Sequence, residues 1–191
     1  MRITQDQARK NRGRALDAAA ELFREKGFDA VGVAEVMHAA GMTHGGFYNH
    51  FDSKEALEAE TCKQVLEGAQ ARLRPLAEIA DADERRRAYD AYRRRYVSKQ
   101  RRDAPAPLCP MIAFASDMPR RPEPTQKAFA DGLAGYLDLF CEMAGALDEA
   151  GRLAAIRDYA TLFGALALAR SVARENSDLS DEILHAAGGG E

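Results

Sequence analysis

The stretch 33–54, VAEVMHAAGMTHGGFYNHFDSK, constrains the fold more than any other part of the 191-residue chain. Its first half has apolar residues at helical spacing, and Gly41 then permits a backbone conformation that other residues resist. Its second half opens at Thr43, a residue type that caps helices, and carries the apolar Phe47 and Phe51 four residues apart. The stretch therefore predicts two short helices joined by a tight turn, which is a helix-turn-helix.

Helical spacing of apolar residues recurs along the rest of the chain, while strand patterns are nearly absent. The sequence predicts an all-α fold of about nine helices, three of which form an N-terminal head on a helical body. Gly27 and Pro75 are expected to end the first and the fourth helix. Further helical segments are expected at residues 83–102, 111–118, 124–147, 153–174 and 179–187.

The segment from Tyr159 to Ala169 is apolar almost all round. A helix of this kind is buried on more than one side, and a second copy of the chain can supply the second covering surface. We therefore expect the helices at 124–147 and 153–174 to form a dimeric four-helix interface. The interface residues expected there are Leu137, Leu162, Phe163 and Leu166.

The net charge of −3 says little by itself, but basic residues gather in two segments. The first is an N-terminal arm with Arg9, Lys10, Arg12 and Arg14, which can contact a nucleic-acid backbone or an adjacent minor groove, or remain a solvated tail. The second lies at 85–102 and is rich in arginine. We expect this second segment to be a solvated helix face, because long arginine stems readily cover apolar surface.

Several classes of protein are disfavoured by composition. No run approaches the roughly 18 apolar residues that a membrane span requires, and the polar, basic N-terminus is unlike a signal peptide. The three cysteines, Cys62, Cys109 and Cys141, are odd in number and widely spaced, which favours a reducing, cytoplasmic location over a disulfide framework. No nucleotide loop, nucleophile elbow or metal-ligand spacing is present, so we expect no enzyme activity, metal or cofactor.

The polar face of the second short helix is suited to double-stranded DNA. Asn49 and His44 are candidates for base edges, whereas Tyr48, His50 and Lys54 are suited to phosphates. Gly45 and Gly46 remove side chains from the first helical turn and allow close approach of the backbone. The full predicted DNA-contacting set is Thr43, His44, Gly45, Gly46, Tyr48, Asn49, His50, Lys54, Arg12 and Arg14.

The first 60 or so residues resemble the TetR family of transcriptional regulators. The first part of the family pattern is carried here by Ala19, Leu22, Phe23, Gly27 and Phe28. The remainder is carried by Ala40, Gly41, Met42, Thr43, Gly45, Phe47, Tyr48, His50, Phe51, Ser53, Lys54 and Leu57. Two positions depart from the pattern: Gly32 replaces a capping Ser or Thr, and Met37 replaces a small residue.

The resemblance implies a homodimer with two DNA-reading heads and a C-terminal pocket for a small-molecule effector. On this basis residues 9–72 are expected to be the DNA-binding domain, with its motif at about 33–52, and residues 73–188 the ligand-binding and dimerisation domain. The function implied is a ligand-responsive regulator, most simply a repressor that binds a palindromic operator and is released by its effector.

Aromatic and methionine side chains at helical spacing in the body are candidates for an apolar effector pocket. They are Tyr89, Tyr92, Tyr96, Met111, Phe114, Met118, Phe129 and Phe140. An alternative signal is oxidation of Cys109, since a thiol near a helix N-terminus can have a lowered pKa. A helical adaptor without DNA binding would explain the all-α body but not the glycine-rich second helix.

Overall fold

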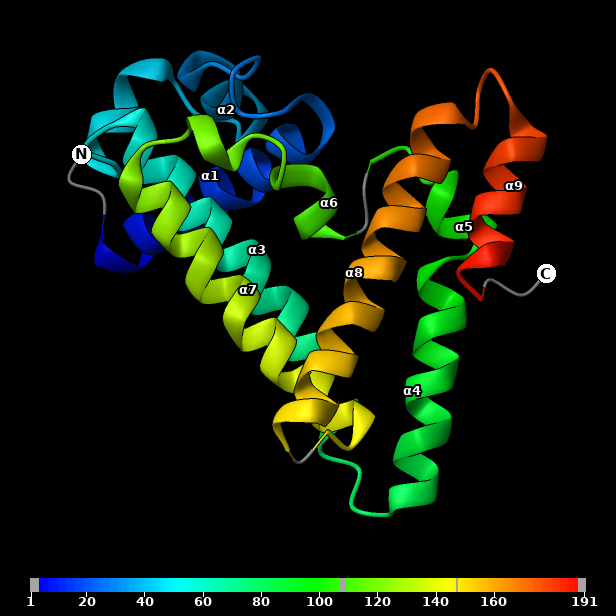
Figure 1. Cartoon of the computed structure of the whole chain (residues 1–191). Coiled ribbons are helices and arrows are strands. Elements are labelled where there is room, and N and C mark those ends of the chain that lie inside the picture. The colour runs from blue at the N-terminus through cyan, green and yellow to red at the C-terminus, as the bar shows by residue number, and fades with distance from the viewer. Residues whose placement is uncertain (1–3, 107–108, 147, 189–191) are drawn as a thin grey trace. The chain divides into compact units, whose positions relative to one another are not determined.

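The computed structural model describes residues 4–106, 109–146 and 148–188. Over these residues the chain forms nine α-helices and two 3-10 helices, with no strand (Figure 1). The predicted all-α fold is therefore confirmed. Within the same ranges, no helix has both the length and the apolar character that crossing a bilayer requires.

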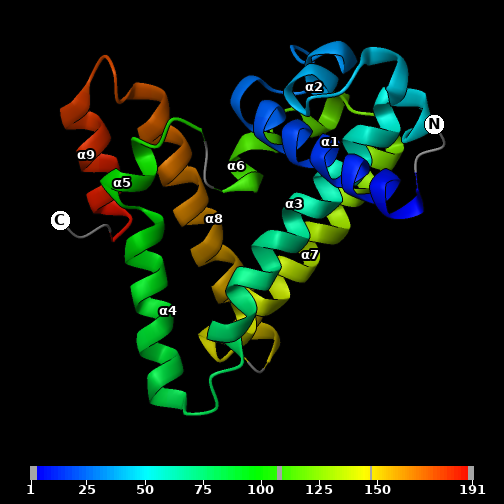
Figure 2. The ribbon, with the colours of Figure 1, turned by 180° about the vertical axis from the view of Figure 1, so that it is seen from behind.

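The chain groups into two compact units that are interleaved in sequence. The first comprises Met1–Gly68 with Cys109–Leu133, and the second comprises Ala69–Leu108 with Ala134–Glu191. Two long helices, α3 (Lys54–Ala77) and α7 (Glu123–Ala144), contribute a part to each unit. The order of the elements can also be followed from behind in Figure 2.

The first unit has a core of phenylalanines. The ring of Phe28 lies 4.8 Å from that of Phe23 and 4.9 Å from that of Phe114, and all three side chains are fully buried. Rings at this separation stabilise each other beyond the area that they bury. Besides the starts of α3 and α7, the elements of this unit are α1 (Gln5–Lys26), α2 (Val33–Ala39), η1 (His44–Asn49), α6 (Pro110–Phe114) and η2 (Met118–Arg120).

The second unit is built round a cluster of aromatic rings, whose neighbouring centroids are 5.3–6.0 Å apart. The rings belong to Tyr89, Tyr92, Tyr96, Tyr136, Phe140 and Tyr159. They lie on α4 (Ala82–Tyr96), on the second part of α7 and on α8 (Glu149–Val172). The short helices α5 (Lys99–Arg102) and α9 (Ser177–Ala186) complete the unit by contacting α8.

Side-chain caps determine where several helices begin. Thr4, Asp81, Ser98, Asp148 and Asn176 each accept a hydrogen bond from the backbone N–H three residues further on. Such caps satisfy one of the donors left free at a helix start. The cap at Ser98 explains why the segment 83–102, expected as one helix, is two helices that meet at Val97 and Ser98.

Pro75 does not end α3, contrary to the expectation from sequence, because the helix continues to Ala77. A proline removes one backbone hydrogen bond and crowds the carbonyl four residues earlier. That cost falls here in the last turn. The bond from the amide of Glu78 to the carbonyl of Arg74, 3.0 Å long, still closes this turn.

The element expected to run as a helix from Thr43 to Phe51 is instead a 3-10 helix of six residues, His44–Asn49. Thr43 has the extended backbone of a cap, yet its side chain makes no capping hydrogen bond. Gly45 and Gly46 lie in the first turn, and each costs an α-helix roughly 1 kcal/mol relative to alanine. The shorter, tighter helix is consistent with that cost.

The helix expected at 124–147 ends at Ala144. Gly145 follows with φ +71°, and the amide of Ala146 donates to the carbonyl of Cys141 at 3.0 Å. This is the bonding of a left-handed helix stop that favours glycine. Leu147, the expected last residue, lies outside the described residues.

Candidate functional site

The 3-10 helix η1 presents a polar surface on a buried aromatic base. Phe47 and Phe51 are 0% and 3% exposed, and their rings stack with centroids 5.5 Å apart. Tyr48 is 71% exposed and sets its ring edge-on to Phe47 at 5.2 Å. The predicted contact residues Thr43, His44, Gly45 and Asn49 are also exposed, whereas Gly46 and His50 are half-buried.

The turn between α2 and η1 depends on Gly41, as the sequence predicts. Its φ is +68°, in the left-handed region, and the amide of Met42 donates to the carbonyl of Met37 at 2.8 Å. The guanidinium of Arg14 donates to the carbonyl of Ala40. Arg14, predicted to contact DNA, is therefore committed to the last turn of α2.

Arg12 is likewise committed within the unit. Its guanidinium pairs with Glu60, donates to the carbonyl of His50 at 3.3 Å and lies 4.7 Å from the ring of Phe51. These contacts join α1 to the end of η1 and to α3. They give Arg12 a positioning role that its place in a basic arm does not reveal.

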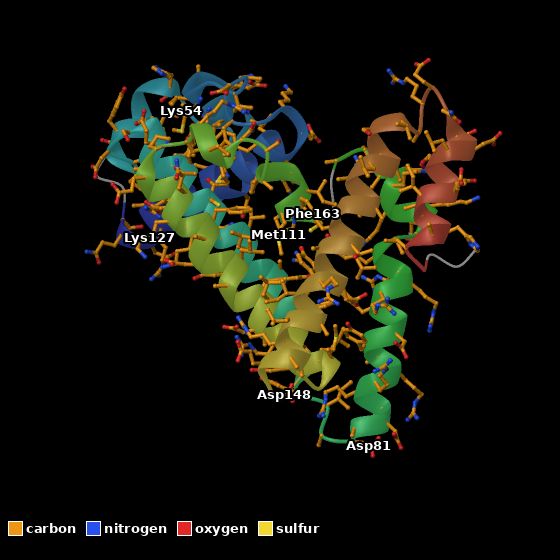
Figure 3. All side chains as sticks on the ribbon, in the orientation of Figure 1. Lys54, Asp81, Met111, Lys127, Asp148 and Phe163 are labelled. Atoms are coloured by element: carbon orange, nitrogen blue, oxygen red, sulfur yellow. The ribbon has the colours of Figure 1, made fainter. Side chains whose placement is uncertain are left out.

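Lys54, labelled in Figure 3 at the start of α3, has partners inside the same unit. Its ammonium donates to the carbonyl of Phe28 at 2.8 Å and lies 3.6 Å from the carboxylate of Glu58. The side chain of Lys54 is 30% exposed. A phosphate would therefore meet an ammonium that the fold already holds in place.

Glu58 is a buried carboxylate that sequence reasoning missed. It is 3% exposed, and burial raises its pKa above the ordinary value, opposed by Lys54 and Arg121. The guanidinium of Arg121 lies 3.8 Å from Glu58 and pairs with Asp29, whose pKa that hydrogen bond lowers. The group links α3, the Phe28–Asp29 turn and the segment before α7. The signal in the sequence was weak, since one glutamate in a helix rarely indicates burial.

The glycines of η1 leave open space rather than filling a tight contact. A Cβ at Gly45 would meet nothing within 4 Å, and one at Gly46 would lie at ordinary contact distance, 3.7 Å, from Met37 and Thr43. Met37, one of the two departures from the family pattern, is fully buried beside Gly46. Gly32, the other departure, stands at the start of α2 with no side-chain cap.

The eight side chains predicted to line one effector pocket are divided between the two units. Phe114 packs against Phe28, and the other three in the first unit are Met111, Met118 and Phe129. All four are buried. The four in the second unit, Tyr89, Tyr92, Tyr96 and Phe140, belong to its aromatic cluster.

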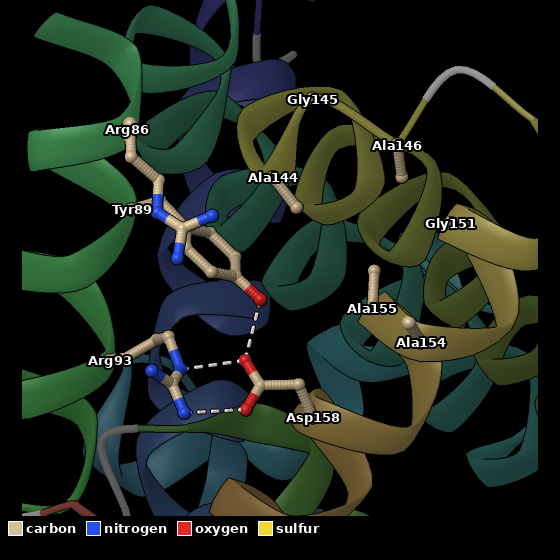
Figure 4. Close-up of a pocket in the computed structure, with 10 residues that line it drawn as sticks. All are labelled: Arg86, Tyr89, Arg93, Ala144, Gly145, Ala146, Gly151, Ala154, Ala155 and Asp158. Carbon is tan, nitrogen blue, oxygen red and sulfur yellow. Dashed lines mark hydrogen bonds and ion pairs between the residues drawn. The ribbon is translucent and has the colours of Figure 1, made fainter. Parts of the chain in front are cut away.

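A cavity of about 350 Å³ lies within the second unit (Figure 4). Tyr89 is the one residue of the eight predicted for the pocket that lines this cavity. Its remaining lining comes from Arg86, Arg93, Ala144, Gly145, Ala146, Gly151, Ala154, Ala155 and Asp158. Two cations and a carboxylate thus border a space for which sequence predicted a mostly apolar lining.

Two of the four predicted dimer residues, Leu162 and Leu166, need correction. Leu162 and Leu166 are 0% and 2% exposed, so they pack inside the single chain and leave no surface for a second copy. Leu137 and Phe163 are half-buried. The large apolar side chains that α8 does expose are Leu153 and Leu168, at 57% and 59%.

The three cysteines are buried. Burial raises the pKa of Cys62 to about 12 and also raises the pKa of Cys141. Cys109, the candidate sensor, is 4% exposed and lies 4.0 Å from the sulfur of Met111. Reactive thiols are exposed and electropositive in their surroundings, so this environment works against redox sensing.

Comparison with known proteins bears on the first unit most directly. Residues 15–61 match the family model described as bacterial regulatory proteins, tetR family. The chain is 44% identical over 52 residues to the HTH-type transcriptional repressor KstR2 of Rhodococcus jostii, and 39% identical over 70 residues to the HTH-type transcriptional regulator UidR of Escherichia coli. The matched stretches are short. They cover 27% and 37% of this chain, and 26% and 36% of the length of KstR2 and of UidR.

Solved structures extend the likeness to the whole fold. The structure of reduced NemR from Escherichia coli superposes with a TM-score of 0.73 over 93% of this chain and 95% of that one, at 20% identity. A transcriptional regulator from Agrobacterium tumefaciens gives a TM-score of 0.70 at 22% identity, over 94% and 98% of the two chains. At such identities the likeness concerns the arrangement of helices.

Proposed function

We propose that the chain is a transcriptional regulator of the TetR type, because residues 15–61 match the model of that family, and that it binds double-stranded DNA through η1 and the residues flanking it. The observation that carries this proposal is the polar surface of η1. The polar side chains His44, Tyr48 and Asn49 are exposed, while the buried Phe47 and Phe51 hold the backbone beneath them. A rigid base of this kind presents hydrogen-bonding groups to a groove at little entropic cost.

Within that surface, His44 and Asn49 are proposed to read base edges, and Tyr48 to contact the backbone. Lys54 and the arm at 9–14 supply positive charge for phosphates. Arg12 and Arg14 have internal partners, and we propose that they act first by holding α1, α2 and η1 in register. Phosphate contacts position a protein on DNA, whereas base contacts specify the sequence.

We further propose a homodimer whose contact includes one strip of α8, defined as Leu153, Arg157, Ala160, Gly164 and Leu168, in which Gly164 is half-buried and the other four are exposed. These residues recur at intervals of three or four and so share one helix face. A Cβ at Gly164 would meet nothing within 4 Å, which leaves room for another helix to approach. A two-fold dimer would require a palindromic site with half-sites about one helical turn apart or more.

Repression, with release by a small molecule, is the regulatory mode that we propose. It is supported by the name of KstR2, a transcriptional repressor, and by the cavity in the second unit. The operator is best found by selecting genomic fragments that the purified chain retains.

The decisive experiment is a titration of the selected operator and of a scrambled duplex at several salt concentrations. About 6–10 phosphate contacts per dimer imply a loss of roughly 10³–10⁵ in affinity between about 50 and about 200 mM salt. Asn49→Ala and His44→Ala should relax discrimination at individual base pairs, at about 1–3 kcal/mol each. Unchanged discrimination by both variants would remove η1 from the reading surface.

Lys54→Ala should weaken binding to both duplexes and flatten the salt slope by up to about two units per dimer. Lys63→Ala is the matched control, because Lys63 is an exposed lysine on the same helix, 68% exposed and paired only with an exposed glutamate among the described residues. A thermal scan of each variant separates lost binding from lost folding. If the two lysine variants bind alike, the ammonium of Lys54 does not face DNA.

Sedimentation tests the dimer. Leu168→Glu should shift the dimer toward monomer, because it places a charge in the proposed contact. Tyr48→Glu is the control, since it alters another large exposed side chain, on the first unit, and should leave the dimer intact. A dimer unaffected by Leu168→Glu would locate the contact elsewhere.

A further inference from the structure

The cavity of the second unit has a polar side and a side made of small residues (Figure 4). Asp158, on α8, faces Arg93, on α4. Each of the two carboxylate oxygens of Asp158 lies 2.7 Å from a nitrogen of the Arg93 guanidinium. The hydroxyl of Tyr89 donates to the same carboxylate. Burial, and then this hydrogen bond, raise the pKa of Tyr89, so the phenol stays protonated and remains a donor.

Arg86 lines the same cavity but is bound more loosely. Its guanidinium lies 5.8 Å from the centre of the Tyr89 ring and 3.3 Å from Asp90, one turn further along α4. The side chain of Arg86 is 66% exposed, whereas that of Arg93 is 35% exposed. A guanidinium has five N–H donors, so the hydrogen bond from Nε of Arg86 to Asp90, 3.3 Å long, leaves most of them available.

The charges bordering the cavity therefore favour an anion. Among the described lining residues the charged groups are Arg86, Arg93 and Asp158. Arg93 already neutralises Asp158 with two close contacts, whereas the partner of Arg86 is Asp90, which does not line the cavity. A cationic ligand would have to displace Arg93 from Asp158, while an anionic ligand needs only to replace the exposed contact with Asp90.

The opposite wall favours a small apolar body. It consists of Ala144, Gly145, Ala146, Gly151, Ala154 and Ala155, from the end of α7, the turn that follows it and the start of α8. The volume of about 350 Å³ lies near the lower limit of ligand pockets, roughly 300–1,000 Å³, so the occupant is a compact molecule.

We propose that this cavity binds a small organic carboxylate with a compact apolar or aromatic body, its carboxylate held by Arg86. Guanidinium and carboxylate match in a two-bond, charge-assisted geometry, and the ring of Tyr89 and the alanines offer apolar surface to the rest of the ligand. The inference rests on the proposed function where it identifies this ligand as the effector. The binding site itself does not depend on that function.

The test uses benzoate as probe, with benzamide and benzylamine as neutral and cationic molecules of nearly the same shape. Calorimetric titration of the full chain should show benzoate binding and at least about tenfold weaker binding of benzamide, the loss of one charge-assisted contact. Equal binding of benzoate and benzamide, or no benzoate binding at millimolar concentration, overturns the proposal.

Arg86→Gln should lower benzoate affinity by about tenfold or more while leaving benzamide unaffected. Arg87→Gln is the matched control, because Arg87 is the next residue of α4, is exposed and does not line the cavity. Ala154→Leu fills part of the cavity without changing charge and should weaken both ligands. Benzoate affinity that is unchanged in Arg86→Gln overturns the assignment of Arg86.

Operator binding measured with and without benzoate separates the existence of the binding site from its role as the effector site. Release of DNA by benzoate in the unmodified chain, absent in Arg86→Gln, supports both the site and its role as the effector site. Benzoate binding without release supports the site and contradicts its effector role. Specific operator binding by a chain that binds no carboxylate overturns the site and leaves DNA binding as proposed.

Discussion

Replacing Gly41 by alanine tests how the turn before η1 is held. The left-handed φ of +68° costs a residue with a side chain about 1–2 kcal/mol. The new Cβ would also lie 2.7 Å from Nη2 of Arg14, which must then leave the carbonyl of Ala40. That hydrogen bond contributes about 0.5–1.5 kcal/mol.

The reduced freedom of alanine in the unfolded chain offsets about 0.4–1 kcal/mol of this loss, so we expect a net destabilisation of about 2 kcal/mol. Urea unfolding followed by circular dichroism measures it. Gly13→Ala is the control, because Gly13 lies inside α1, where a Cβ would meet nothing within 4 Å. That change should instead stabilise the chain, by about 0.5–1 kcal/mol.

A double-mutant cycle divides the loss into its two parts. In an Arg14→Ala background the steric conflict and the hydrogen bond are both gone, and only the backbone strain at Gly41 remains. Gly41→Ala should then cost about 1 kcal/mol less than in the unmodified chain. An identical cost in the two backgrounds would show that Arg14 has no part in holding the turn, and no cost in either would refute the argument from backbone strain.

Other substitutions examine the packing, the buried charge and the thiols. Gly132→Ala should destabilise the first unit by about 1–3 kcal/mol, since its Cβ would lie 2.6 Å from Cδ1 and 2.7 Å from Cβ of Leu66. Leu66→Ala in the same chain removes Cδ1 but keeps Cβ, so it should relieve the clash only in part. Urea unfolding measures both changes, and an unchanged midpoint in Gly132→Ala would contradict this close packing. Because the pKa of Glu58 is raised in the folded state, its contribution to stability is fully present below about pH 4 and is lost as the pH rises through the folded pKa. Glu58→Gln should therefore gain stability relative to the unmodified chain between about pH 4 and about pH 7, and a constant difference over that range would refute the raised pKa. Ellman's reagent should label the buried thiols of Cys62, Cys109 and Cys141 only after unfolding. Rapid labelling in the native state would support the redox hypothesis again.

The parts of the fold that could be predicted from sequence are those governed by local chemistry. Gly27 and Gly41 were expected to adopt special backbone conformations, and both have positive φ. Phe47 and Phe51 are the apolar residues of the second short helix in the sequence, and both are buried. In each case the residue type itself restricts the backbone or favours burial. Contacts with residues distant in sequence therefore have little influence on the outcome.

The parts that could not be predicted depend on tertiary packing. The run from Tyr159 to Ala169 is apolar on nearly every face, so periodicity could not show that Leu166 is buried while Leu168 is exposed. Aromatic residues at helical spacing likewise fit a packed core as well as a cavity wall. Among the predicted pocket residues, Tyr89 lines the described cavity and Phe114 lies in the core of the first unit.

The interleaving of the two units has a consequence for how the chain folds during synthesis. A ribosome that has made residues up to Gly68 has supplied α1, α2 and η1, but not Phe114, which covers Phe28, nor Arg121, which pairs with Asp29. At about 5–20 residues per second, the segment up to Leu133 emerges roughly 3–13 s later. During that interval the nascent head exposes apolar surface that a chaperone can bind, and a truncated head fragment would keep that surface exposed permanently.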